Sequence, residues 1–233
     1  MNVSELLESL NQVNRRELTE LEAKRVLEEY DIPVVKTELA NTEVEATALS
    51  KELKYPVVLK IASPDILHKV DAGGVKTLLN NSEEVIKAFN EIIKNAKNYD
   101  PNARILGVTV QHHIPRGVEV IVGGLKDPIF GPCVMFGMGG TWVEVMNDVS
   151  FRLAPTKFES AMVMITEIKA YPLLTRYRGS EGVDIKGIAD IIVKISKLMH
   201  DNSLISEVDV NPVFARVDST IAVDARIVLD EKT

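Results

Sequence analysis

Cysteine is nearly absent from this sequence, because Cys133 is the single cysteine among 233 residues. A lone thiol excludes a disulfide framework and a cysteine-rich metal cluster, and it fits a reducing cytoplasm, where we expect this protein. Basic charge is also scarce, since 27 Lys and Arg residues stand against 34 Asp and Glu residues, which gives a net charge of −7. Without a basic stripe that carries interleaved aromatics, we expect no nucleic acid among its partners.

Long apolar runs are lacking as well. The first twenty residues, MNVSELLESLNQVNRRELTE, contain acidic side chains and no long apolar run, so they predict neither a signal peptide nor a membrane span. We expect an amphipathic helix or arm over residues 1–16, and no membrane partner. The composition that remains is 45% hydrophobic and 26% charged, which suits one large domain or two smaller lobes.

Helix and strand patterns alternate in the first half of the chain. Apolar residues recur at helical spacing in residues 18–30 and 42–53, and Thr42 with Glu45 forms a capping-box pattern at the start of the second helix. The stretches YPVVLKIA, VKTLLN and RILGVTVQHHI predict strands, and SEEVIKAFNEIIKNA predicts a capped helix. We therefore expect a first α/β lobe over residues 17–109, with helices that cover a sheet.

The second half is richer in strands separated by turn residues. The predicted strands are GVEVIVGGLKD, FGPCVMFGMGG, DVSFRLAP, LISEVDVNPVFARV and STIAVDARIVL, with helices near residues 158–169 and 184–199. Hairpins are the expected connections, so this lobe, residues 110–233, should be largely antiparallel. The predicted fold class is α/β (α+β), with two lobes and a cleft between them.

Lys60 and the glycine pair that follows it are candidate phosphate ligands. Lys60 ends the apolar strand PVVLK, where its side chain either points to solvent or reaches into a cleft to neutralise phosphates. In DAGGVK, Gly73 and Gly74 mark either a simple turn or a nest of backbone amides that binds an anion. The spacing matches neither a P-loop nor a dinucleotide fingerprint, so a phosphate site here is of another type.

Acidic residues gather near the C-terminus. In SEVDVNP, strand alternation places Glu207, Asp209 and Asn211 on one face, and Asp224 lies on the next predicted strand. Carboxylate and amide oxygens in such a group suit Mg²⁺, although a solvated strand face with scattered acids has the same pattern. The apolar neighbours favour the metal interpretation.

The four histidines differ in what they can do. His112 and His113 are adjacent on a predicted strand, so they point to opposite faces and cannot chelate one ion together, and His200 ends a predicted helix. His68 lies in a polar loop, as a surface residue, a general base, or a nucleophile that carries a phosphoryl group on a ring nitrogen.

These elements in this order resemble the ATP-grasp (β) subunit of the ADP-forming acyl-CoA synthetases of the acetyl-CoA synthetase type. The resemblance covers nearly the whole chain and rests on Lys60, HKVDAGGV, EVDVNP, VDAR, and the block GVEVIVGGLKDPIFGPCVMFGMGGTWVEVMNDVSFRLAP. The β subunit of succinyl-CoA synthetase is a more distant relative. The resemblance implies the reaction acyl-CoA + ADP + phosphate ⇌ carboxylic acid + CoA + ATP, with Mg²⁺ and ADP or ATP bound by this chain.

The resemblance also implies a partner and a phosphohistidine relay. The CoA site and a first phosphohistidine belong to a separate α subunit, so this chain should be half of a heteromeric enzyme, which we expect to be an α2β2 heterotetramer. His68 occupies the position of the second histidine, which passes the phosphoryl group to ADP, and Asp209 would orient it. Lys60, Gly73 and Gly74 would contact the nucleotide phosphates, and Asn211 and Asp224 would hold Mg²⁺.

The adenine end of the implied site departs from the family pattern. Val110 and Gln111 match the family's hinge strand, which hydrogen-bonds the adenine, and Glu119 lies in the family's GVEVIVG strand and faces the cleft. His112 and His113, however, stand where a glutamate and a methionine are usual. The base preference between ADP and GDP is therefore left open by the sequence. Two other functions remain as alternatives: an ATP-grasp carboxylate ligase that makes an acyl phosphate in its own cleft, and a non-catalytic nucleotide-sensing subunit.

Overall fold

The computed structural model describes residues 3–66, 68–139, 148–175 and 181–230. The chain divides into two compact units: a small unit, Val35–Pro115, and a large unit, Met1–Val34 together with Arg116–Thr233. These boundaries differ from the expected lobes, because residues 17–34 belong to the large unit and the first lobe extends past residue 109 to Pro115. Within the described residues, no helix is long and apolar enough to cross a membrane.

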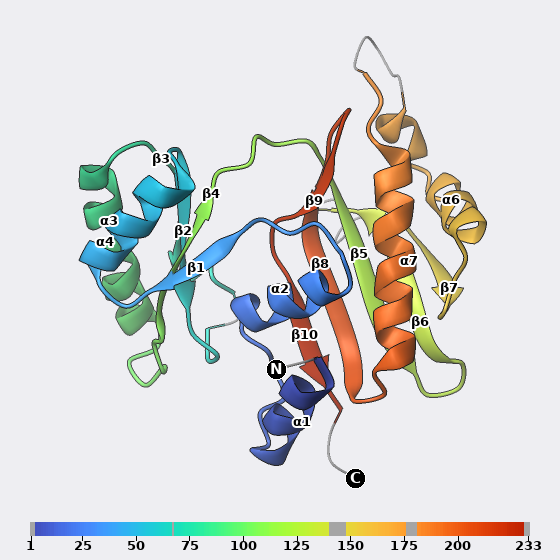
Figure 1. The fold of residues 1–233 in the computed structure, drawn as a ribbon, viewed down its shortest axis with the longest axis horizontal. Helices are drawn as coiled ribbons and strands as arrows, with labels where there is room; N and C mark the ends of the chain where they lie inside the picture. Colours follow the sequence, from blue (N-terminus) through green and yellow to red (C-terminus); the bar gives the residue numbers. More distant parts are fainter. Residues whose placement is uncertain (1–2, 67, 140–147, 176–180, 231–233) are drawn as a thin grey trace. The chain divides into compact units, whose positions relative to one another are not determined.

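The small unit is an antiparallel sheet with two helices on one face (Figure 1). Its strand order is β1-β4-β2-β3. The elements are β1 Thr37–Ala40, α3 Glu43–Leu53, β2 Val57–Ala62, β3 Val75–Leu79, α4 Ser82–Tyr99 and β4 Gly107–His112. Strand β4 pairs with β2 along its whole length and with β1 from residue 108 to 111, which explains why the unit does not end inside this strand.

Both helices of the small unit begin at side-chain caps. The Thr42 hydroxyl accepts a hydrogen bond from the Glu45 backbone N–H at 3.2 Å, as the sequence predicts. The Glu45 carboxylate, however, accepts from the N–H of Asn41, one residue before the cap, at 2.7 Å, so the capping box is not reciprocal. Asn81 caps α4 through the Glu84 N–H at 3.0 Å.

The large unit contains a six-stranded antiparallel sheet of order β10-β8-β5-β6-β7, with β9 paired to β8. Helices α6 and α7 pack together on one face of this sheet (Figure 1). The strands are β5 Val118–Asp127, β6 Gly131–Met138, β7 Val149–Leu153, β8 Ile205–Ala215, β9 Thr220–Ala222 and β10 Arg226–Leu229. The helices are α1 Val3–Gln12, α2 Glu20–Glu29, α6 Phe158–Thr166, the 3₁₀ helix η1 Tyr171–Leu174, and α7 Ile185–Asp201.

The N-terminal segment belongs to this large unit for two reasons. Residues 16–18 run along the outer edge of β10, where the Leu18 N–H donates to Ile227 and the Leu229 N–H donates to the Arg16 carbonyl. Helix α2 then contributes apolar side chains, among them Val26 and Leu27, to the core of the large unit. The predicted separate arm over residues 1–16 is helical in α1, and its buried leucines join the same core.

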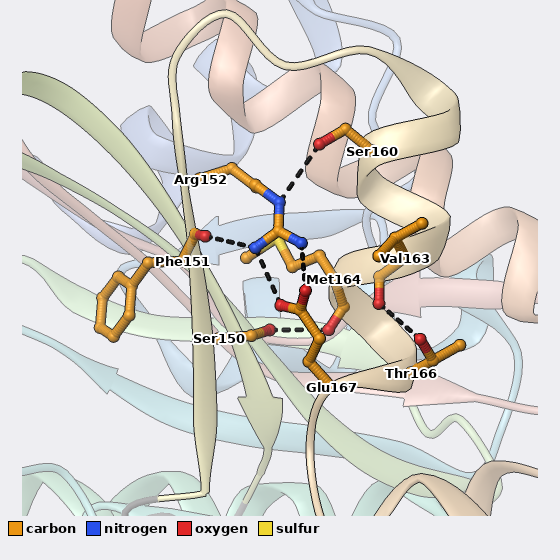
Figure 2. A network of polar contacts seen from close by, with 8 residues as sticks. All are labelled: Ser150, Phe151, Arg152, Ser160, Val163, Met164, Thr166 and Glu167. Carbon is orange, nitrogen blue, oxygen red and sulfur yellow. Dashed lines mark hydrogen bonds and ion pairs between the residues drawn. The ribbon is translucent and has the colours of Figure 1, made fainter.

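A polar network fixes α6 against the edge strand β7 (Figure 2). The Arg152 guanidinium, on β7, forms a two-pronged ion pair with Glu167 and donates from Nε to the Ser160 hydroxyl at 3.2 Å. Ser150 lies two residues before Arg152 on the same face of β7, and its hydroxyl donates to the Met164 carbonyl at 2.8 Å. Arg152 and Ser150 thus point to the helix side, which leaves Phe151 on the opposite face of the sheet.

Candidate functional site

Lys60 lies on the face of the small sheet that points away from α3 and α4. Its neighbours along β2, Leu59 and Ile61, are buried in the core beneath the helices, so alternation turns Lys60 the other way. Lys60 is only 5% exposed, and Thr109, directly opposite on β4, is 2% exposed. The interpretation of Lys60 as a solvated strand residue is therefore wrong, and a buried ammonium group of this kind needs anionic or polar partners.

Gln111 shares that polar face, whereas the other hinge candidates do not. The Gln111 side chain is 1% exposed and its carbonyl oxygen accepts a hydrogen bond from the Thr37 hydroxyl at 3.3 Å. Val110 is fully buried in the apolar core. The ring Nδ1 of His112 lies 2.9 Å from the Lys54 carbonyl oxygen, on the opposite side of β4 from Gln111. Of these side chains, only Gln111 points the same way as Lys60.

The loop from His68 to Gly74 is closed by its own backbone. The Gly74 N–H donates to the Lys69 carbonyl at 2.8 Å, and the Gly73 N–H donates to the Val70 carbonyl at 2.9 Å. Both glycine amides are thus engaged inside the turn, so in this conformation they do not form the anion-binding nest that the sequence suggested. The His68 side chain, at the start of the loop, is exposed to solvent.

The glycines are required here by conformation and space. Gly73 has φ +61°, a region that residues with a Cβ atom rarely adopt. A Cβ on Gly74 would lie 2.6 Å from a methyl carbon of Ile61 and 3.0 Å from the Lys69 carbonyl oxygen. The glycine pair therefore allows the loop to pack against β2, the strand that carries Lys60.

The acidic residues of β8 lie on the face of the large sheet opposite α6 and α7. Val208 and Val210 are buried in the core, while Glu207 and Asp209 alternate with them and point the other way. Glu119 on β5 also points away from the core, with a side chain that is 31% exposed and an Arg116 guanidinium nitrogen at 4.0 Å. The alternation predicted for Glu207 and Asp209 is confirmed.

Asn211, at a β-bulge in β8, lies opposite Asp224, because the pairs Asp209–Arg226 and Val213–Ala222 on either side keep one register. Val122 pairs with Val210 and Val120 with Val213, so β8 has one residue more than β5 between these pairs. Asp224 lies in the segment between β9 and β10, and the adjacent Val223 N–H donates to the Pro212 carbonyl at 3.0 Å. The expectation that Asp224 sits on one continuous strand is wrong, because two short strands, β9 and β10, flank it.

Asp209 has the most unusual environment of these acids. Its Oδ1 atom is buried and has no hydrogen-bond partner. Burial, followed by the negative charge of Glu207, raises the pKa of the carboxyl group from 3.8 to about 6, with Asp224 adding to the rise and Arg226 opposing it. A buried carboxylate oxygen without a donor costs free energy, which makes Asp209 the candidate here for an interaction with another group.

The oxygen groups at the bulge suit a magnesium ion that arrives with a nucleotide. In residues 3–66, 68–139, 148–175 and 181–230, no cluster of three or more His, Cys, Asp or Glu side chains is able to hold a metal by itself. Mg²⁺ commonly takes one or two protein oxygens and completes its shell with water and substrate phosphates. Asn211 and Asp224 fit that role, with the unpaired oxygen of Asp209 beside them.

The sequence reasoning missed Glu17 and Arg226. Arg226 stands directly opposite Asp209 in the β8–β10 register, and its guanidinium binds Glu207 at 3.1 Å and Glu17. Arg226 follows Asp224 by two residues in the VDAR motif. Pairing the last two predicted strands would have placed it next to Asp209. No sequence pattern pointed to Glu17, because its contact with Arg226 joins residues that are 209 positions apart.

The predicted site residues fall into two groups, one in each unit. Lys60, His68, the glycine pair and the hinge strand belong to the small unit. Glu119, Asp209, Asn211 and Asp224 belong to the large unit. Within each unit, tertiary contacts bring together residues that are distant in sequence.

Comparison with known proteins gives a consistent result. A family model described as an ATP-grasp domain matches residues 9–229. The chain is 52% identical to the β subunit of acetate–CoA ligase (ADP-forming) I from Pyrococcus furiosus, over 97% of each chain. It is 47% identical to acetate–CoA ligase (ADP-forming) I from Archaeoglobus fulgidus, where the match covers 89% of this chain but 30% of that longer protein.

Solved structures show the same likeness. Acetyl-coenzyme A synthetase 1 of Ca. Korarchaeum cryptofilum, in complex with coenzyme A and Ca-AMPCP, superposes with a TM-score of 0.95 at 49% identity, over 97% of this chain and 99% of that one. Another structure of that enzyme, with a TM-score of 0.87 and 46% identity over the same fractions, contains coenzyme A and Mg-AMPPCP, with its phosphohistidine segment pointing towards the nucleotide site. The strand-rich two-unit architecture, the family match and these relatives together place the chain in the ATP-grasp family, among the β subunits of the ADP-forming acetate–CoA ligases.

Proposed function

We propose that this chain binds ADP or ATP with Mg²⁺ and passes a phosphoryl group between the nucleotide and an α subunit through His68. The overall reaction is acyl-CoA + ADP + phosphate ⇌ carboxylic acid + CoA + ATP. The observation that carries the proposal is the buried, unpaired Oδ1 of Asp209, beside the oxygen side chains at the bulge. Such an atom requires a donor, and an imidazole N–H meets that need.

Each of these side chains would have its own part in nucleotide binding. Lys60 supplies a buried positive charge for the phosphates, and Gln111, on the same sheet face, offers an amide to the adenine end. Asn211 and Asp224 would hold Mg²⁺, which neutralises phosphate charge when it is bound. Gly73 and Gly74 act by shaping the His68 loop, and their amides would reach a phosphate only after a change in the turn.

In the transfer step, an unprotonated ring nitrogen of His68 attacks the γ-phosphorus of ATP. A P–N bond forms while the P–O bond to ADP breaks, and ADP leaves with the electron pair of that bond. Asp209 would accept a hydrogen bond from the other ring nitrogen, which fixes the tautomer and stabilises the charge on the phosphorylated ring. The reverse step delivers the group from phosphohistidine to ADP.

The partner follows from the relatives. The chain is matched by proteins named β subunits over nearly their full length, and it covers 30% of the single-chain ligase from A. fulgidus. An α partner would therefore supply the remaining functions, including the CoA site. We propose an α2β2 assembly in the cytoplasm, which native mass spectrometry of the co-expressed subunits would test.

Labelling tests the role of His68. The isolated chain, incubated with Mg²⁺ and γ-labelled ATP, should gain an acid-labile, base-stable label, and His68→Asn should abolish it because an amide is a far poorer nucleophile. His200→Asn is the matched control, since His200 is exposed at the end of α7 and should leave labelling unchanged. Near-normal turnover of His68→Asn in the complex with the α subunit would refute the relay through this residue.

A further inference from the structure

The Arg226 guanidinium is held by two glutamates and not by the aspartate that faces it. Arg226 and Asp209 are direct cross-strand partners in the antiparallel pair β8–β10, a position at which side chains of opposite charge interact favourably. Instead, Nη1 donates to Glu207 at 3.1 Å and Nη2 donates to Glu17. Arg226 Nε and Asp209 Oδ1 are both buried, and both lack a hydrogen-bond partner.

Glu17 is a fixed anchor for the arginine. Its backbone forms a bridge with Val228, two residues along β10 from Arg226, and hydrogen bonds at Leu18 and Arg16 secure both sides of this bridge. The Glu17 side chain is 26% exposed, less than that of Glu207 at 48%. The carboxylate that is better shielded from solvent therefore holds the guanidinium from the N-terminal segment.

We propose that Glu17 is a positioning residue: it restrains Arg226 and so keeps Asp209 Oδ1 available to the phosphoryl-carrying histidine. Glu17 engages the guanidinium, and the carboxylate of Asp209 remains free to accept a hydrogen bond from the imidazole. This inference rests on the proposed function, because it concerns what the unpaired oxygen is for. When the Glu17 charge is removed, Nη1 keeps its bond to Glu207, and the freed Nη2 turns to the carboxylate of Asp209, the cross-strand partner of Arg226.

The test is turnover of the complex with the α subunit, at pH 8.5, in Glu17→Gln, Arg226→Gln and the double variant. Glu17→Gln should lower kcat between about tenfold and 100-fold, the scale of a mispositioned catalytic group, with the nucleotide Kd unchanged. Arg226→Gln should stay within about threefold of wild type, and adding it to Glu17→Gln should restore turnover to that level. A crystal structure of Glu17→Gln should place the guanidinium about 3 Å from Asp209 Oδ1.

The control is Glu22→Gln, which breaks the Arg15–Glu22 ion pair in the same N-terminal segment and should leave kcat within about twofold of wild type. Unchanged kcat in Glu17→Gln, or a double variant as slow as Glu17→Gln, would overturn the inference. If Glu17→Gln proves unstable, Glu207→Gln removes the other anchor and should lower kcat in the same direction. Failure of His68→Asn to lose turnover would refute the proposed function itself, whatever Glu17→Gln does.

Discussion

Replacing Asp209 with Asn should make the protein more stable at neutral pH while abolishing phosphoryl transfer. In the folded protein, burial and the Glu207 charge raise the pKa of this carboxyl group from 3.8 to about 6, so the ionised form is penalised by folding. That difference corresponds to roughly 3 kcal/mol of unfolding free energy. An asparagine has the same shape and carries no charge, so it avoids the penalty.

The sign of the pH dependence follows from proton binding. Between pH 3.8 and about 6, the folded state keeps a proton on Asp209 that the unfolded state has released. Stability of the wild type therefore falls as pH rises through this window, and the loss is complete above it. The stability advantage of Asp209→Asn should be near zero below pH 4 and should reach up to about 3 kcal/mol above pH 6.

Urea unfolding in EDTA, followed by circular dichroism from pH 4 to pH 8, measures this difference. Asp218→Asn is the control, because Asp218 is exposed and its replacement should change stability by less than about 0.5 kcal/mol at every pH. An Asp209→Asn protein that is less stable than wild type at pH 8, or equally stable at every pH, would show that the folded protein does not penalise this charge.

Three further variants test the small unit and the N-terminal segment. Gly74→Ala should cost about 1–3 kcal/mol and lower Tm by about 2–12 °C, because its Cβ would lie 2.6 Å from Ile61; a Tm within 1 °C of wild type in calorimetry would contradict the crowding. Lys60→Met should leave the circular dichroism spectrum unchanged and abolish ADP binding in titration calorimetry, so wild-type affinity would exclude Lys60 from the phosphate site. Thr19→Ala should lose about 0.5–2 kcal/mol in urea unfolding, since Thr19 and Glu22 form a reciprocal capping box at α2, and no loss would show that the cap is unimportant.

Much of the fold could be predicted from local sequence pattern. The strand around Lys60, the capped helices α3 and α4, and the alternation of Glu207 and Asp209 with buried valines all depend on periodicities of two or 3.6 residues and on caps a few residues away. The break between β9 and β10 could not be predicted, because the residues around Asp224 have the pattern of one strand and the register to β8 is the same on both sides of the break.

The chemistry of the candidate site depended more on tertiary structure. The sequence by itself determined which residues carry charge and nitrogen nucleophiles, namely Lys60, His68, Asp209 and Asp224. Only the folded chain decided that Lys60 is buried, that the Asp209 oxygen has no partner, and that Arg226 binds Glu17 from 209 residues away. Burial and the choice among competing ion-pair partners are set by which strands lie side by side, and local sequence pattern does not encode that arrangement.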